Sequence, residues 1–213
     1  MYDFRPNLVI GFHGCEDAVK QKLINSSSSI QISQKPYDWL GHGMYFWENN
    51  QDRAMEWATE KQKRGEIKTP AVLQLGYCCD LLDSRYVQLL KNYYGLMADY
   101  YNAMGQDLPE NKDLKNDYYK DKILRVLDCR VIEYMHNEIY EQYKEDISVK
   151  GFSDLKIFES TRCVFTEGGP AYAGAGIFEK SHIQICIRNP DCIKGFFNPR
   201  KSTPFSKWVE KSY

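Results

Sequence analysis

The stretch that decides the fold is "GHGMYFWENNQDRAMEWA", residues 41–58. Two glycines stand within three positions, three consecutive aromatic residues follow, and a helix-forming run begins directly after them. Glycines this close together weaken a strand unless another backbone or a ligand must come near it. The stretch therefore predicts a short strand over 43–48, a helix over 49–65, and a close neighbour beside Gly41 and Gly43.

Apolar runs of strand type lie on both sides of this stretch. They are the segments 7–14, 70–83, 156–168, 181–189 and 192–197. A short helix is predicted over 16–25, where apolar residues have helical spacing before a run of serines.

Residues 84–146 have a different pattern, with apolar residues every three or four positions on both sides of a polar break at 105–113. This spacing predicts two amphipathic helices. The apolar positions are Leu90, Tyr94, Met97, Tyr101 and Met104, then Leu124, Leu127, Val131, Met135, Ile139 and Tyr143. We therefore expect an α+β fold: one domain over 1–213, with a split mixed, mostly antiparallel β core and a helical insertion at about 84–146.

Composition places the chain among globular proteins, because 43% of its 213 residues are hydrophobic and 14% are aromatic. The net charge of −1 provides no strong field toward nucleic acid or an anionic membrane. Seven scattered cysteines without a CxxC pair predict reduced thiols and no metal site. The first residues lack the features of a signal peptide, and no apolar run is long enough to span a membrane, so we expect a cytoplasmic protein without membrane contacts.

Three segments carry residues that could do chemistry: "FHG" (12–14), "GHGMYFW" (41–47) and "HIQICIRN" (182–189). Each has an ordinary structural interpretation when taken alone. A histidine at a strand end, such as His13, is more often structural, and Tyr45 and Phe46 would usually be core residues. Gln184 could be any polar residue on a sheet face.

In this order and at this separation, the three segments resemble the ADP-ribosyltransferases of the diphtheria-toxin and poly(ADP-ribose) polymerase type. That family has a His-Gly at the end of its first strand, a Gly-x-Gly-x-Tyr-Phe block on its second, and a glutamate on a late strand. The likeness covers roughly the first 60 and the last 50 residues, and Gln184 stands where the glutamate would be.

The resemblance implies roles toward NAD for the residues of the first two segments. His13 would hydrogen-bond the adenosine ribose, and the backbone of Gly14 would pair with the nicotinamide amide. Tyr45 would stack on the nicotinamide ring, for which a flat amphipathic side chain is well suited. Phe46 is assigned to the same cofactor-binding surface.

Small residues in the second segment are expected to make room for NAD. Gly41 and Gly43 would keep Cβ atoms away from the cofactor where it crosses the strand. Ala54, on the following helix, would be small for the same reason. Trp57 would close the far wall of the site.

Gln184 is the departure from the family pattern. The family's glutamate holds the 2-hydroxyl of the nicotinamide ribose and stabilises the positive charge that develops as the C1–N bond breaks. A unit charge at about 5 Å with an effective dielectric near 20 contributes about 3 kcal/mol, on the order of a hundredfold in rate. A glutamine therefore predicts a slow enzyme, an inactive one, or a carboxylate borrowed from Glu167 or Glu179. Both flank the glycine-rich loop "GPAYAGAG" (169–176), where they could equally be solvated loop charges.

The sequence thus favours a mono-ADP-ribosyltransferase that cleaves NAD and modifies a macromolecular acceptor, with a protein favoured over nucleic acid. An NAD glycohydrolase and a catalytically silent module that binds NAD or ADP-ribose are the alternatives, and a fourth is that the resemblance is accidental. By analogy, a small transferase of this kind would be a bacterial toxin or defence effector, with an antitoxin as its partner.

Overall fold

The computed structural model describes residues 4–26, 30–62 and 68–198. The strands are β1 (Phe4–Gly14), β2 (Met44–Glu48), β3 (Lys68–Asp80), β4 (Asn111–Lys112), β5 (Leu124–Arg125), β6 (Ser160–Phe165), β7 (His182–Ile187) and β8 (Ile193–Phe196). The helices are α1 (Asp17–Asn25), α2 (Gln51–Gln62), α3 (Ser84–Ala103) and α4 (Val126–Lys150), with a 3-10 turn at Pro190–Cys192. The end of the helix predicted over 49–65 lies partly outside the described residues.

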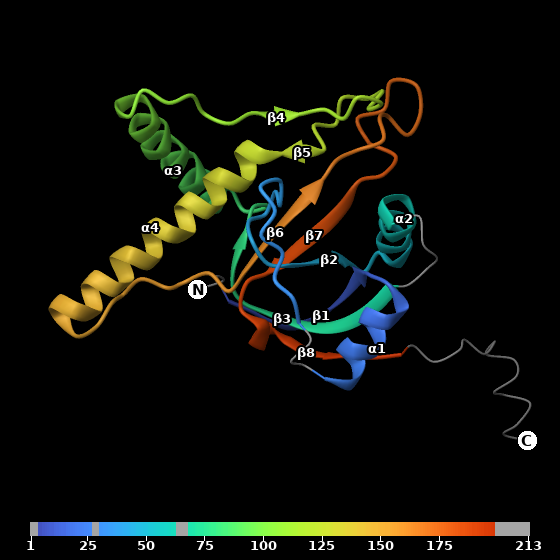
Figure 1. Cartoon of the computed structure of the whole chain (residues 1–213), viewed down its shortest axis with the longest axis horizontal. Coiled ribbons are helices and arrows are strands. Elements are labelled where there is room, and N and C mark those ends of the chain that lie inside the picture. The colour runs from blue at the N-terminus through green and yellow to red at the C-terminus, as the bar shows by residue number, and fades with distance from the viewer. Residues whose placement is uncertain (1–3, 27–29, 63–67, 199–213) are drawn as a thin grey trace, which may run out of the picture.

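The main sheet has the strand order β1-β2-β7-β6-β3-β8. Strand β1 also pairs with β3, so the pairings of β1, β2, β7, β6 and β3 close into a ring, with β8 along the free edge of β3 (Figure 1). The β3–β6 pair is parallel and the other pairs of this sheet are antiparallel. The predicted α+β class with a mixed, mostly antiparallel sheet is confirmed.

The interior of the ring is filled by apolar side chains from most of its strands. Alternate residues of β2 and β7 point inward, as the two-residue period of a strand requires. The buried members of this cluster are Cys15, Leu23, Met44, Phe46, Ala71, Leu73, Leu75, Cys78, Ile185, Ile187 and Cys192.

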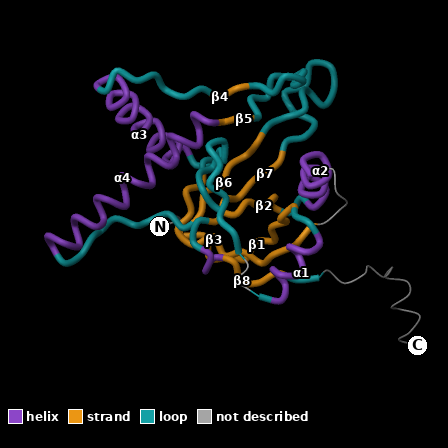
Figure 2. Tube along the Cα trace, viewed as in Figure 1, coloured by secondary structure: helices purple, strands orange, loops and turns teal. Residues whose placement is uncertain are grey.

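The helical middle of the chain lies outside the ring (Figure 2). Asp83 begins α3 by accepting a hydrogen bond from the backbone N–H of Arg85, and Gly151, with φ 78°, ends α4. The first half of α4 packs on the sheet through apolar residues such as Ile132 and Met135, whereas its second half extends away from the sheet. No helix in the described part of the chain is long and apolar enough to cross a membrane.

Two details of the helical middle differ from the prediction. The chain at Leu124–Arg125 forms β5 and pairs with β4, so α4 begins at Val126 instead of at the first apolar position. Met97 is fully buried as expected, but Met104 is exposed, because no described residue covers the end of α3.

A substitution at Gly43 tests how tightly β2 packs. A Cβ there would collide with the thiol of Cys186 and lie 2.6 Å from the carbonyl oxygen of Ile187. We expect Gly43→Ala to lower the free energy of unfolding by about 1–3 kcal/mol, the usual cost of overpacking. Gly95→Ala is the matched control, because Gly95 lies in α3 with open space around it. It should stabilise the protein by about 0.5–1 kcal/mol. Urea denaturation measures both, and a neutral Gly43→Ala would contradict the packing.

Candidate functional site

Three neighbouring strands bring His13, Tyr45 and Gln184 together. Strand β2 lies between β1 and β7, and Trp47 is opposite Phe12 on one side and Gln184 on the other. Because alternate residues of a strand share a face, Tyr45, Trp47 and Gln184 lie on the outer face of the ring. The three segments, which are far apart in the sequence, therefore lie on neighbouring strands.

His13 stands where β1 separates from β2. The paired register of the two strands ends at Phe12 and Trp47. Past this last pair, the carbonyl oxygen of Tyr45 is bonded by the His13 ring instead of by the backbone of β1, with Nδ1 at 2.8 Å. A carbonyl only accepts, so Nδ1 carries the proton. Burial lowers the pKa of His13, although the hydrogen bond to the Tyr45 carbonyl opposes this effect. The ring is thus neutral near pH 7, and its Nε2 is an acceptor without a partner among the described residues.

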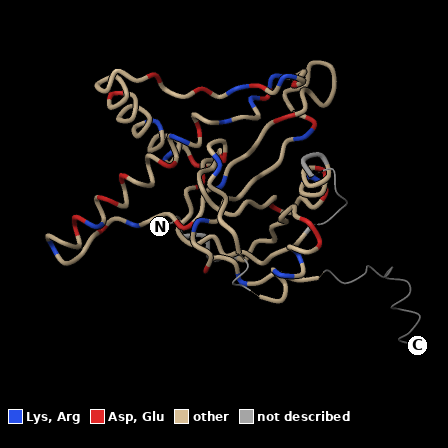
Figure 3. The backbone as a smooth tube through the Cα atoms, in the orientation of Figure 1, with Lys and Arg blue, Asp and Glu red and all other residues tan. Residues whose placement is uncertain are grey.

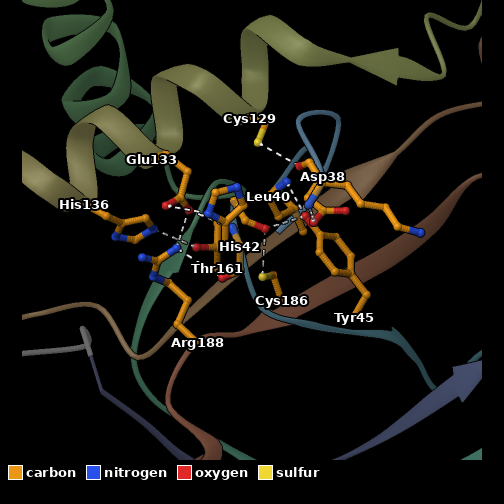
Figure 4. Close-up of polar contacts among 12 residues, drawn as sticks. Asp38, Leu40, His42, Tyr45, Cys129, Glu133, His136, Thr161, Cys186 and Arg188 are labelled. Carbon is orange, nitrogen blue, oxygen red and sulfur yellow. Dashed lines mark hydrogen bonds and ion pairs between the residues drawn. The ribbon is translucent and has the colours of Figure 1, made fainter. Parts of the chain in front are cut away.

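The phenol of Tyr45 anchors the segment that precedes β2. Its hydroxyl accepts from the backbone N–H of Leu40 and donates to the carbonyl oxygen of Gly41, both at 2.8 Å (Figure 4). Burial raises the pKa of Tyr45 well above its ordinary value, so the hydroxyl stays protonated. The ring is partly buried against Trp39 and Ile132.

Helix α4 holds the same segment from the other side. The carboxylate of Glu133 accepts from the backbone N–H of His42 at 2.7 Å and from the guanidinium of Arg188 (Figure 4). The closest neighbours of the glycines are therefore parts of this chain. A Cβ on Gly41, whose φ is 84°, would lie 2.6 Å from Glu133 Oε1. A Cβ on Gly43 would meet β7. The packing of α4 and β7 thus gives a reason for both glycines without a ligand, and the expectation that they make room for NAD stays a prediction.

Two further residues assigned to the cofactor are packing residues instead. Phe46 is fully buried inside the ring, since it faces opposite to Tyr45 on the same strand. Ala54 is also fully buried, and its carbonyl oxygen lies 2.6 Å from where a Cβ of Gly14 would be. Ala54 thus belongs to the close contact between α2 and β1, and Phe46 belongs to the core inside the ring. Trp57 is only partly buried, with its ring centroid 5.5 Å from that of Trp47.

Gln184 has a partner that the sequence did not indicate. The indole Nε1–H of Trp39 donates to Gln184 Oε1 at 2.6 Å. An indole N–H is only a donor, so this bond fixes the orientation of the amide. The Nε2 group of Gln184 has no hydrogen-bond partner among the described residues. One lone pair of the oxygen is therefore in use, and the other is available to a ligand hydroxyl.

Of the two glutamates predicted near Gln184, one is engaged and one is exposed. Glu167 forms an ion pair with Arg53, which also pairs with Glu56. Glu179 is exposed, and its backbone N–H donates to the carbonyl oxygen of Gly169. The Arg53–Glu167 pair thus connects the glycine-rich loop to α2.

Three buried polar atoms near Gln184 have no hydrogen-bond partner in the described part of the chain: Trp47 Nε1, Arg53 Nε and His182 Nε2. His182 Nδ1 lies 2.7 Å from the carbonyl oxygen of Lys180, so Nδ1 carries the proton and Nε2 is an acceptor. Two donors and one acceptor suit a ligand group that both accepts and donates, such as a hydroxyl or an amide. Sequence reasoning missed Trp47 and Arg53, because each reads as an ordinary strand or helix residue.

His182 gives the stability of the protein a dependence on pH. Burial lowers its pKa to about 4 from an ordinary value near 6.5. As the pH falls below about 6.5, His182 becomes protonated in the unfolded state while it stays neutral in the folded state. The free energy of unfolding therefore decreases between about pH 6.5 and pH 4. The shift corresponds to a maximal loss of about 3 kcal/mol. Urea denaturation at pH 7 and pH 4.5 measures the decrease in the free energy of unfolding. We expect the part of this decrease that comes from His182 to be mostly absent in His182→Asn. An unchanged loss in the variant would contradict the assignment.

Comparison with known proteins gives one relative and no assigned function. No family model matches the chain, and no solved structure matches it. The chain is similar to the uncharacterized protein MJ0359 of Methanocaldococcus jannaschii, with 25% identity over 195 residues. The match covers 86% of this chain and 83% of the relative, so most of each chain is included.

Proposed function

We propose that the chain has an ADP-ribosyltransferase-type core, binds NAD along β1, β2 and β7, and transfers one ADP-ribose to a macromolecular acceptor. The observation that carries this proposal is the placement of His13, Tyr45 and Gln184 on three successive neighbours of the sheet. The resemblance assigns all three residues to one NAD site. A local match of sequence would not require that arrangement.

The residues suit the roles that NAD cleavage needs. His13 Nε2 can accept from a ribose hydroxyl, and the partly buried Tyr45 ring offers a stacking surface. Gln184 Oε1 can accept a second hydrogen bond from the 2-hydroxyl. Nicotinamide leaves as the C1–N bond breaks, and an acceptor nucleophile bonds to C1 and releases a proton. Since Gln184 brings no charge to C1, we expect slow turnover.

One observation favours a second candidate, a silent module that binds NAD or ADP-ribose. The bond from Trp39 occupies the Gln184 oxygen on which the ribose hydroxyl would depend. In a module of this kind the same residues would hold the dinucleotide without breaking it.

The proposal is tested by incubating the purified protein with a cell lysate and with NAD that carries a label on its adenylate part. Label on a macromolecule is the expected result. Free ADP-ribose alone would indicate an NAD glycohydrolase, and bound but uncleaved NAD would indicate the silent module. Neither binding nor cleavage of NAD would remove the proposed function.

Two substitutions test the binding surface directly. His13→Ala and Tyr45→Ala should each weaken NAD binding by about tenfold, the scale of one oriented hydrogen bond or one stacking contact. Calorimetry measures the affinity, and Tyr172→Ala, on the exposed glycine-rich loop, is the control. Tyr45→Phe keeps the ring and should bind NAD like the native protein. If both alanine variants also bind NAD unchanged, the cofactor binds elsewhere.

A further inference from the structure

The chain between α3 and α4 carries four exposed lysines. Lys112, Lys115, Lys120 and Lys122 are exposed, and none forms an ion pair with a described residue. Figure 3 shows blue and red stretches along the connection between α3 and α4, which contains β4 and β5. We call residues 112–122 the lysine–tyrosine segment.

The aspartates of this segment have other partners. Asp113 Oδ1 accepts from the backbone N–H of Lys122 at 2.8 Å, and Asp117 Oδ2 accepts from that of Asp121 at 2.9 Å. Asp121 Oδ2 in turn accepts from the backbone N–H of Gly168 at 2.9 Å. With four lysines and three aspartates, the segment has a formal charge of +1 in a chain of −1. Because each carboxylate is tied to backbone, the ammonium groups are what the segment offers to a partner.

Aromatic rings stand among these lysines. The side chain of Tyr118 is 86% exposed and that of Tyr119 is 51% exposed, with the two rings edge to face at 5.0 Å. Tyr119 rests against Gly169, so Tyr118 extends farthest into solvent. Exposed rings between cationic side chains match the way in which proteins bind single-stranded nucleic acid, with bases stacked on rings and phosphates near lysines.

The segment lies near the proposed NAD site around Gln184. Asp121 and Tyr119 fasten it to the glycine-rich loop at Gly168 and Gly169. A few residues later, the Arg125 guanidinium lies over the rings of Phe165 and Trp39, with centroid distances of 3.8 and 4.8 Å. Trp39 is the residue that bonds Gln184. A strand bound to the lysine–tyrosine segment would therefore extend toward Gln184.

We propose that the lysine–tyrosine segment binds single-stranded nucleic acid and that this strand is the ADP-ribose acceptor. The acceptor part rests on the proposed function. A nucleophilic base nitrogen or hydroxyl bonds to C1 of the ribose, nicotinamide leaves with the electrons of the C1–N bond, and the acceptor loses one proton. The sequence alone favoured a protein acceptor; the unpaired lysines and exposed rings favour a nucleic acid. Duplexes fit less well, because their bases are already stacked on one another.

Fluorescence anisotropy with labelled 15-nucleotide single strands of DNA and RNA, without NAD, tests the binding. The double variant Lys115→Glu/Lys120→Glu should weaken binding at least tenfold. The slope of log affinity against log salt concentration should become smaller in magnitude by about 1.4, because each lost phosphate contact removes about 0.7. Tyr118→Ala should weaken it on the order of tenfold, the scale of one stacked base. The control Lys22→Glu/Lys91→Glu makes the same charge change at exposed positions on α1 and α3 and should bind like the native protein.

Three binding results would overturn the inference: no oligonucleotide binding by the native protein at 50 mM salt, an equal loss of affinity in the control variant, or a preference for duplex. A fourth is transfer of label from NAD to protein but never to the oligonucleotide. Binding is measured without NAD, so its failure leaves the proposed function standing. Failure of nicotinamide release, measured separately, would remove the proposed function and leave the binding result intact.

Discussion

Replacing Gln184 with glutamate is expected to increase the rate of NAD cleavage about a hundredfold. The new carboxylate would lie where positive charge develops on the ribose as nicotinamide leaves. At about 5 Å and an effective dielectric near 20, that charge stabilises the transition state by about 3 kcal/mol. Nicotinamide release from saturating NAD gives the rate.

The structure accommodates this substitution without loss of a hydrogen bond. Trp39 donates to the side-chain oxygen that glutamate retains, and the Nε2 group that would be lost has no partner among the described residues. Gln142→Glu, on the exposed part of α4, is the control for the added charge and should leave the rate unchanged. An unchanged or lower rate for Gln184→Glu would show that Gln184 does not face the reacting carbon.

Replacing Arg162 with methionine is expected to lower the free energy of unfolding by about 3–5 kcal/mol, the usual cost of removing one partner of a buried ion pair. Arg162, on β6, is only 8% exposed. Its Nε and Nη2 donate to Glu48, and its Nη1 lies 3.2 Å from both oxygens of Asp80. The substitution would remove the guanidinium that pairs with both Glu48 and Asp80.

Urea denaturation at pH 7 measures this loss. Arg85→Met is the control, because Arg85 is exposed and pairs with Asp83 at the surface, where an ion pair contributes about 0–1 kcal/mol. A loss of less than about 1 kcal/mol for Arg162→Met would contradict a structural role for the network. The network connects β2, β3 and β6, so it also helps to hold β2 and its Tyr45 in place.

The strands and helices could be predicted from the sequence because their signals are local. Two glycines followed by aromatic residues marked β2, an apolar run marked β7, and helical spacing with a polar break separated α3 from α4. The closure of the ring could not be predicted, because it depends on β1 pairing with both β2 and β3 at long range. The approach of Glu133 to Gly41 is also a long-range contact, so the sequence contains no sign of this reason for the glycine.

Three motifs in the sequence singled out His13, Tyr45 and Gln184 as one candidate site, but not the contacts that these residues make. Their placement on neighbouring strands is known only from the structure. The bond from Trp39 to Gln184 and the ion pair of Arg53 with Glu167 join residues far apart in the chain, for which one sequence gives no signal. The error at Phe46 was avoidable, because neighbouring residues of a strand face opposite sides and Tyr45 had already been placed toward the ligand.

The most direct test of the central claim is the initial rate of nicotinamide release from NAD by the native chain and by Gln184→Ala. The account predicts slow but measurable release by the native chain, reduced about tenfold to a hundredfold in the variant, the scale of one hydrogen bond to a group that becomes charged. Glu167→Gln and Glu179→Gln, assayed alongside, should release nicotinamide like the native chain unless one of them supplies a borrowed carboxylate. Robust native release that none of these substitutions changes, or no release by either the native chain or Gln184→Glu, would contradict the account.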